Sequence, residues 1–178
     1  MIVKRRANQI GFTLIEILVV LIIVGLLAAL AVFNMAGSSQ KRELENTVQD
    51  LFLLMQTASE QAILNNLELG LLIEDDNYRF VSYQDDTGEW KLSGERLFRA
   101  RPLPEWLTLT DYIENDAPRL TSAEDRLRPD VVFFSSGETT PFIIEFTIGN
   151  NTDDMHVIES DGVSPLQWRK PGSEDEAW

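Results

Sequence analysis

The chain of 178 residues contains no cysteine, one histidine and only 15 lysines and arginines. The missing cysteine excludes disulfide bonds, cysteine-ligated zinc sites and thiol nucleophiles. The single histidine, His156, cannot build a multi-histidine metal site. Nucleophile elbows of the Gly-x-Ser-x-Gly type and phosphate loops of the Gly-x-x-x-x-Gly-Lys type are also absent. We therefore expect no enzymatic activity, no cofactor and no metal.

Basic residues are outnumbered by 29 acidic ones, which gives a formal net charge of −14. Binding to nucleic acid requires clustered lysine and arginine, so this charge argues against a nucleic-acid partner. The acidic pairs Asp75-Asp76, Asp85-Asp86 and Asp153-Asp154 lie in predicted turns. No Asp-x-Asp-x-Asp-Gly calcium loop is present, and we interpret the pairs as solvated turns.

Apolar residues are concentrated near the N-terminus. Residues 17–33 are 17 residues without a polar side chain, and the stretch from Phe12 to Phe33 is 22 residues long. A helix of that length measures about 33 Å and spans a hydrocarbon core. Lys4, Arg5 and Arg6 precede it, whereas residues 34–178 carry 12 basic and 28 acidic side chains. The positive-inside rule then places the N-terminus in the cytoplasm and the acidic bulk across the membrane.

Glu16 lies at the start of this apolar run. A carboxylate in lipid costs about 2.5–3.5 kcal/mol or more unless a cation pairs with it. No lysine or arginine lies between residues 7 and 40, so the cation must come from another chain or from an amine created by processing. The alternative is an ordinary secretory signal peptide, with residues 29–31 or 34–36 as its cleavage site. The length of the run and the presence of Glu16 count against that alternative.

The segment Gly11-Phe12-Thr13-Leu14-Ile15-Glu16 resembles the processing site of type IV pilins and of the pseudopilins of type II secretion systems. The resemblance implies that a prepilin peptidase cleaves between Gly11 and Phe12 and N-methylates Phe12. It also implies that Glu16 pairs with the Phe12 amine of a neighbouring subunit during assembly.

A second periodic segment follows the apolar run. Its apolar residues recur at spacings of four and three, which predicts an amphipathic helix with one buried stripe. The stripe consists of Leu44, Val48, Leu51, Met55, Ala58 and Ala62. We expect it to contact the protein's own domain. Gly37 lies between the two segments and is a predicted soft spot in the helix.

Short strands with frequent turns are predicted after Asn66. They cover residues 67–73, 78–83, 97–100, 107–109, 131–134, 142–148, 155–159 and 165–169, with a long loop over 113–129. One helix followed by strands predicts an α+β fold. The resemblance to the pilins and pseudopilins implies, more specifically, a long N-terminal α-helix packed on an antiparallel β-sandwich. The predicted organisation is a basic leader, which is removed (1–11), a transmembrane and assembly helix (12–33), the amphipathic periplasmic half of the helix (34–66), a periplasmic β domain (67–170) and an acidic tail (171–178).

Residues 133–142, Phe-Phe-Ser-Ser-Gly-Glu-Thr-Thr-Pro-Phe, resemble a strand–turn–strand pattern near the C-terminal end of the H-type minor pseudopilins. This resemblance implies a pilin-like fold and a structural subunit near the tip of the type II secretion pseudopilus, which assists export of folded proteins across the outer membrane. The implied partners are other minor pseudopilins, the major pseudopilin, the prepilin peptidase and the inner-membrane assembly platform. The implied location is the bacterial inner membrane, with a single pass, a cytoplasmic N-terminus and a periplasmic C-terminal domain.

Three other functions are open. A minor type IV pilin, for pilus assembly or DNA uptake, would be expected to carry a basic C-terminal patch. Residues 150–178 hold two basic and seven acidic side chains instead. A major pseudopilin typically has proline at the position of Phe33 and a calcium-binding loop near its C-terminus. A periplasmic enzyme on a membrane stalk would need catalytic groups that this sequence lacks.

Overall fold

The structure is a computed structural model that describes residues 13–113 and 127–173. Helix α1 (Leu14–Asn65) comes first and is 52 residues long. Its backbone is helical through Gly37, where the sequence predicts a soft spot, and the side chains of residues 30–38 are outside the description. The remaining elements are β1 (Leu69–Ile73), β2 (Asn77–Gln84), β3 (Glu89–Leu92), the 3-10 helix η1 (Arg96–Phe98), β4 (Arg101–Pro102), β5 (Leu107–Ile113), β6 (Val131–Phe133), β7 (Phe142–Ile148), β8 (Asn151–Ser160) and β9 (Gln167–Arg169).

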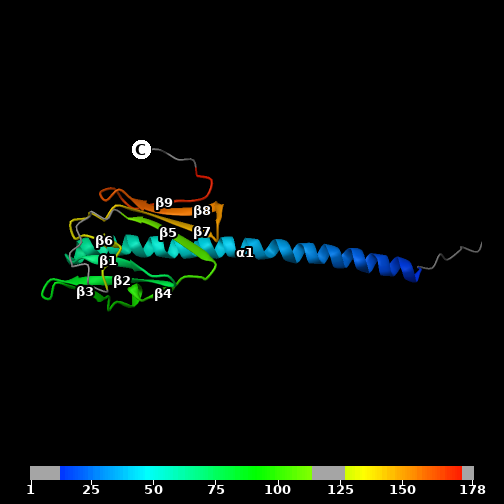
Figure 1. Cartoon of the computed structure of the whole chain (residues 1–178), viewed down its shortest axis with the longest axis horizontal. Helices are drawn as coiled ribbons and strands as arrows, with labels where there is room; N and C mark the ends of the chain where they lie inside the picture. Colours follow the sequence, from blue (N-terminus) through cyan, green and yellow to red (C-terminus); the bar gives the residue numbers. More distant parts are fainter. Residues whose placement is uncertain (1–12, 114–126, 174–178) are drawn as a thin grey trace, which may run out of the picture. The chain divides into compact units, whose positions relative to one another are not determined.

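The chain divides into two compact units, residues 1–40 and residues 41–178. In the second unit the strands form two antiparallel sheets, and the C-terminal part of α1 runs between them (Figure 1). The first sheet has the order β3-β2-β1-β6, with β4 paired to β2, and the second has the order β5-β7-β8-β9. The predicted class, a long N-terminal helix packed on antiparallel β-structure, is confirmed.

One hydrophobic core joins the helix to both sheets. It contains Leu51 and Met55 from α1, Phe80 from β2, and Ile144 and Phe146 from β7. The six stripe residues predicted on the helix are each at most 1% exposed. Their 3.6-residue periodicity places them on one face, and the two sheets cover that face. The prediction that this stripe contacts the protein's own domain is confirmed.

The main differences from the predicted strands concern residues 97–100, 107–109 and 155–159. The last of these strands is β8, which begins at Asn151, so Asp153 and Asp154, predicted in a turn, lie in a strand. Residues 97–100, predicted as a strand, belong instead to η1 and the turn after it, because Phe98 is buried there with its ring centroid 4.9 Å from that of Phe80. The strand predicted at residues 107–109 extends to Ile113, along the full length of β7. The strands predicted at residues 155–159 and 165–169 lie in β8 and β9, which pair with each other antiparallel. Most of the predicted loop over residues 113–129, and residues 174–178 of the predicted tail, lie outside the described residues.

Candidate functional site

The start of α1 is the first candidate site. Gly11 and Phe12, the predicted cleavage and methylation positions, lie outside the described residues, and the description begins at Thr13. The Glu16 N–H donates to Thr13 Oγ1 at 3.3 Å and to the Thr13 carbonyl at 3.1 Å. Thr13 therefore caps the helix. The Thr-x-x-Glu spacing from Thr13 to Glu16 is that of a capping box, a local signal that our sequence reasoning missed.

The Glu16 side chain lies in the first turn of α1, where the helix dipole favours a negative charge. It is exposed, and no described lysine or arginine pairs with it. The predicted pairing with a neighbouring subunit's amine stays a prediction, since the structure contains one chain.

The large apolar side chains at the start of α1 are exposed all around the helix. Leu14, Leu21 and Leu27 are 84%, 66% and 61% exposed, and Val19, at 47%, is the least exposed of the large apolar residues from Leu14 to Leu27. Within residues 13–113 and 127–173, no helix meets the length and hydropathy of a membrane span. The span predicted over 12–33 includes Phe12 and the side chains of residues 30–33, which lie outside the description.

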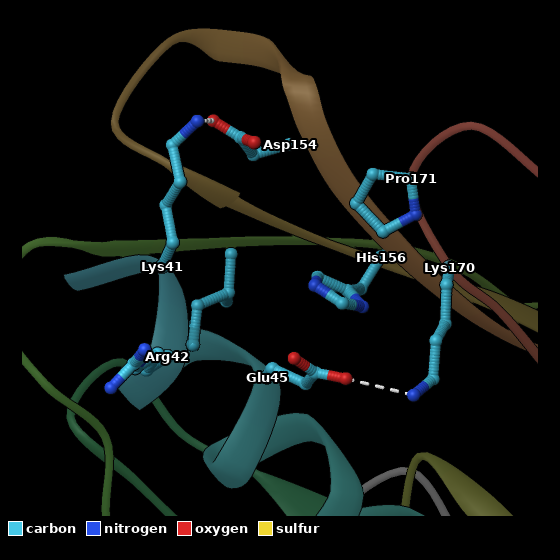
Figure 2. A pocket seen from close by; sticks show the side chains of 8 residues that line it. Lys41, Arg42, Glu45, Asp154, His156, Lys170 and Pro171 are labelled. Atoms are coloured by element: carbon cyan, nitrogen blue, oxygen red, sulfur yellow. Dashed lines mark hydrogen bonds and ion pairs between the residues drawn. The ribbon is translucent and has the colours of Figure 1, made fainter. Parts of the chain in front are cut away.

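A second candidate site lies in the second unit. It is a groove between the first residues of α1 in that unit, from Lys41 on, and the second sheet. Its volume is about 270 Å³. Figure 2 shows His156 from β8 between two ion pairs, one from Asp154 of β8 and one from Lys170, which follows β9, to the helix. Lys41 Nζ lies 2.8 Å from Asp154 Oδ2, and Lys170 Nζ lies 2.8 Å from Glu45 Oε1.

His156 is only 4% exposed. Its Nδ1 accepts a hydrogen bond of 3.2 Å from Trp168 Nε1, so the ring proton of the neutral form resides on Nε2. Burial lowers the pKa of His156, and Lys170 lowers it further, whereas Glu45 and Asp154 act in the opposite direction. The imidazole is therefore held neutral as an acceptor for Trp168.

Both carboxylates of this groove are already engaged. The hydrogen bond from Lys170 lowers the pKa of Glu45, and Lys170 also lies 4.5 Å from the centroid of the Trp168 ring. With His156 Nδ1 bonded to Trp168 and each acid paired with a lysine, no general base is left free in the groove. The groove has a structural role, because its two ion pairs hold β8 and the end of β9 against α1. Glu45 and Lys170 are 125 positions apart, so no local sequence signal could have identified it.

No group of three or more histidine, cysteine, aspartate or glutamate side chains in the described part of the chain is arranged to hold a metal ion. The predicted absence of a metal is an expectation that concerns the whole protein, whereas this observation covers residues 13–113 and 127–173.

Two protein-family models match the chain. The prokaryotic N-terminal methylation motif matches residues 6–32. The family described as type II transport protein GspH matches residues 47–162.

Among curated proteins, the chain is 33% identical over 144 residues to the type II secretion system protein H of Pseudomonas aeruginosa. This alignment covers 77% of this chain and 81% of that protein. It is 30% identical over 152 residues to the type II secretion system protein H of Aeromonas hydrophila. That alignment covers 80% of this chain and 83% of that protein. The type II secretion system core protein G of Klebsiella michiganensis is 42% identical over 62 residues, which are 35% of this chain and 43% of that protein.

A crystal structure of the minor pseudopilin EpsH from the type II secretion system of Vibrio cholerae has the same fold. Its TM-score is 0.62 at 22% identity, over 76% of this chain and 99% of that one. This likeness confirms the pilin-like arrangement of helix and sheets.

Proposed function

Because the chain belongs to the GspH family and is a minor pseudopilin of the type II secretion system, a structural protein and not an enzyme, we propose how its N-terminus is processed and used. The methylation motif over residues 6–32 implies processing by a prepilin peptidase. We place the cut between Gly11 and Phe12 and the methyl group on the new Phe12 amine. The order Gly11-Phe12 before the capped turn at Thr13 supports this placement.

The apolar segment stays on the mature protein as its anchor. Residues 12–33 span the inner membrane, with the N-terminus in the cytoplasm and the β domain in the periplasm. The three basic residues before the run and the acidic bulk after it support this orientation. The exposure of the large apolar side chains between Leu14 and Leu27 supports a lipid or subunit environment around them.

Glu16 directs assembly by pairing with the Phe12 amine of a neighbouring subunit. A carboxylate flanked by Ile15 and Ile17 is costly in lipid until a cation reaches it. No described lysine or arginine of the same chain pairs with Glu16, which supports a partner from outside the chain. The observation that carries the proposal is this exposed acid in the first turn of α1, directly before a run of apolar residues.

In the assembled filament the protein lies near the tip of the pseudopilus. Its partners are the other minor pseudopilins, the major pseudopilin and the inner-membrane assembly platform, and its role is to assist export of folded proteins across the outer membrane. The family membership supports the secretion system as the setting. The absence of free catalytic groups in the groove around His156 supports a structural role there.

The test is a deletion in the source organism, scored in the same cultures for extracellular enzymes and for surface pili. We expect secreted enzymes to be lost while pili remain. Loss of pili with intact secretion would instead indicate a minor type IV pilin.

The processing step is tested by complementing that deletion with the wild-type chain or with Gly11→Ala. The wild-type chain recovered from membranes should begin at Phe12, with a mass increased by one methyl group. The variant should keep its leader and fail to restore secretion. A variant that is trimmed normally, or a wild-type chain cleaved elsewhere, would contradict the assigned position.

A further inference from the structure

A groove of about 390 Å³ runs beside the edge strand β5, opposite the turn between β1 and β2. We call it the β5 groove. Its lining residues are Ile73, Glu74, Asp75, Leu103, Leu107, Thr108, Leu109, Asp111 and Asp130. The lining combines three features that bear on what it can bind: a strand edge, an apolar floor and an acidic rim.

The strand edge comes from the position of β5 in its sheet. All seven residues of β5 pair with β7 on one side, and β5 is the outermost strand of the order β5-β7-β8-β9. The Leu107 N–H bonds to the Pro104 carbonyl at 2.9 Å, so the edge without a described strand partner begins at Thr108. A strand edge of this kind presents alternate backbone N–H and C=O groups, which is a template for one more strand.

The floor of the β5 groove is apolar. Ile73, Leu103, Leu107 and Leu109 are half-buried and pack against the hydrophobic core of the domain. Half-buried apolar side chains beside a strand edge provide the contacts that alternate side chains of an added strand would use.

The rim carries four carboxylates and no lysine or arginine. Two of the four are engaged: Glu74 pairs with Arg79, and Asp130 Oδ2 accepts a 2.7 Å hydrogen bond from the Ile73 N–H. Asp75 and Asp111 are exposed and take part in no ion pair with a described residue. The charge of the groove is therefore complementary to a basic segment and repels a second copy of the same acidic edge.

We propose that the β5 groove binds an extended segment of a partner protein that carries lysine or arginine, and that this segment pairs with β5 as an additional strand. Main-chain hydrogen bonds to β5 provide the affinity, and basic side chains facing Asp75 and Asp111 provide the specificity. The site is independent of Gly11, Phe12 and Glu16, so its test does not depend on the processing proposed above.

The test uses the full chain in detergent and two labelled nonapeptides, one alternating lysine with valine and one alternating glutamate with valine. We expect the lysine peptide to bind and the glutamate peptide not to bind. The double variant Asp75→Asn with Asp111→Asn should weaken binding of the lysine peptide about fivefold. The matched control is Asp85→Asn with Asp86→Asn, which removes two exposed acids from the turn between β2 and β3 and should leave binding unchanged.

Hydrogen exchange then locates the peptide. Within residues 108–113, the alternate amides that point away from β7 should exchange more slowly when the lysine peptide is bound, because an added strand hydrogen-bonds them. If both double variants weakened binding equally, the peptide would be held by general charge attraction, and the proposal would be overturned. The proposal would also be overturned if these amides were already protected without peptide and no peptide bound, since the chain itself would then fill the groove. Calcium binding that is abolished by the Asp75 and Asp111 substitutions, without peptide binding, would replace the strand site by a cation site.

Discussion

The two parts of α1 carry apolar side chains for opposite purposes. Between Leu14 and Leu27 every large apolar side chain is at least 47% exposed, whereas the stripe from Leu44 to Ala62 is at most 1% exposed. The strands of the same chain cover the second part. In the described residues nothing covers the first part, which is consistent with the proposed contact with lipid or with another subunit. The comparison separates residues that hold the domain together from residues that act outside it.

The sharpest test of this separation is to truncate one leucine in each part. Leu44→Ala leaves a cavity in the core and should lower the free energy of unfolding of the domain by about 2–5 kcal/mol. Leu21→Ala should change it by less than about 0.5 kcal/mol, because Leu21 contributes nothing to that core. Urea unfolding of the full chain in detergent, followed by tryptophan fluorescence, measures both. A comparable loss in Leu21→Ala would mean that the first part of the helix also stabilises the domain.

The glycines provide a second, smaller contrast. A Cβ added at Gly70 would lie 2.4 Å from the Pro129 Cβ and 2.6 Å from its Cγ, so Gly70→Ala forces the strand β1 away from that proline. We expect a loss of about 1–3 kcal/mol in the free energy of unfolding. A Cβ at Gly25 would meet no atom within 4 Å, and Gly25→Ala should leave domain unfolding unchanged. Equal stability of the two variants would show that the contact with Pro129 relaxes without cost.

The same positions show how far the sequence could predict the structure. The stripe was predictable because its spacing of four and three depends only on helix geometry. The burial of Phe98 was not predictable, because it depends on Phe80 from β2, and the 3-10 helix η1 forms where a strand was expected. Glu16 was identified as a functional candidate because it interrupts an apolar run, but the cap from Thr13 was overlooked although its spacing is local.

The buried His156 predicts a smaller effect, a dependence of the free energy of unfolding on pH. Because burial lowers its pKa below 6.5, the folded state binds fewer protons at His156 than the unfolded state in mildly acidic solution. The stabilisation is therefore complete above the ordinary histidine pKa and is lost as the pH falls through it toward the lower folded value. In His156→Gln, the slope of the free energy of unfolding against pH between about pH 7 and 5 should become flatter than in the wild type. An unchanged slope would assign the acid sensitivity to other groups.

The central claim, that the first part of α1 acts between subunits and the second part within the domain, is tested most directly at Glu16. A deletion strain is complemented with Glu16→Gln or with the matched control Glu60→Gln, an exposed acid of the same helix beside the β domain. Extracellular enzymes and the amount of each chain in the membrane are measured together. The account predicts that Glu16→Gln abolishes most secretion at a normal chain level, while Glu60→Gln secretes like the wild type. Wild-type secretion by Glu16→Gln would contradict it.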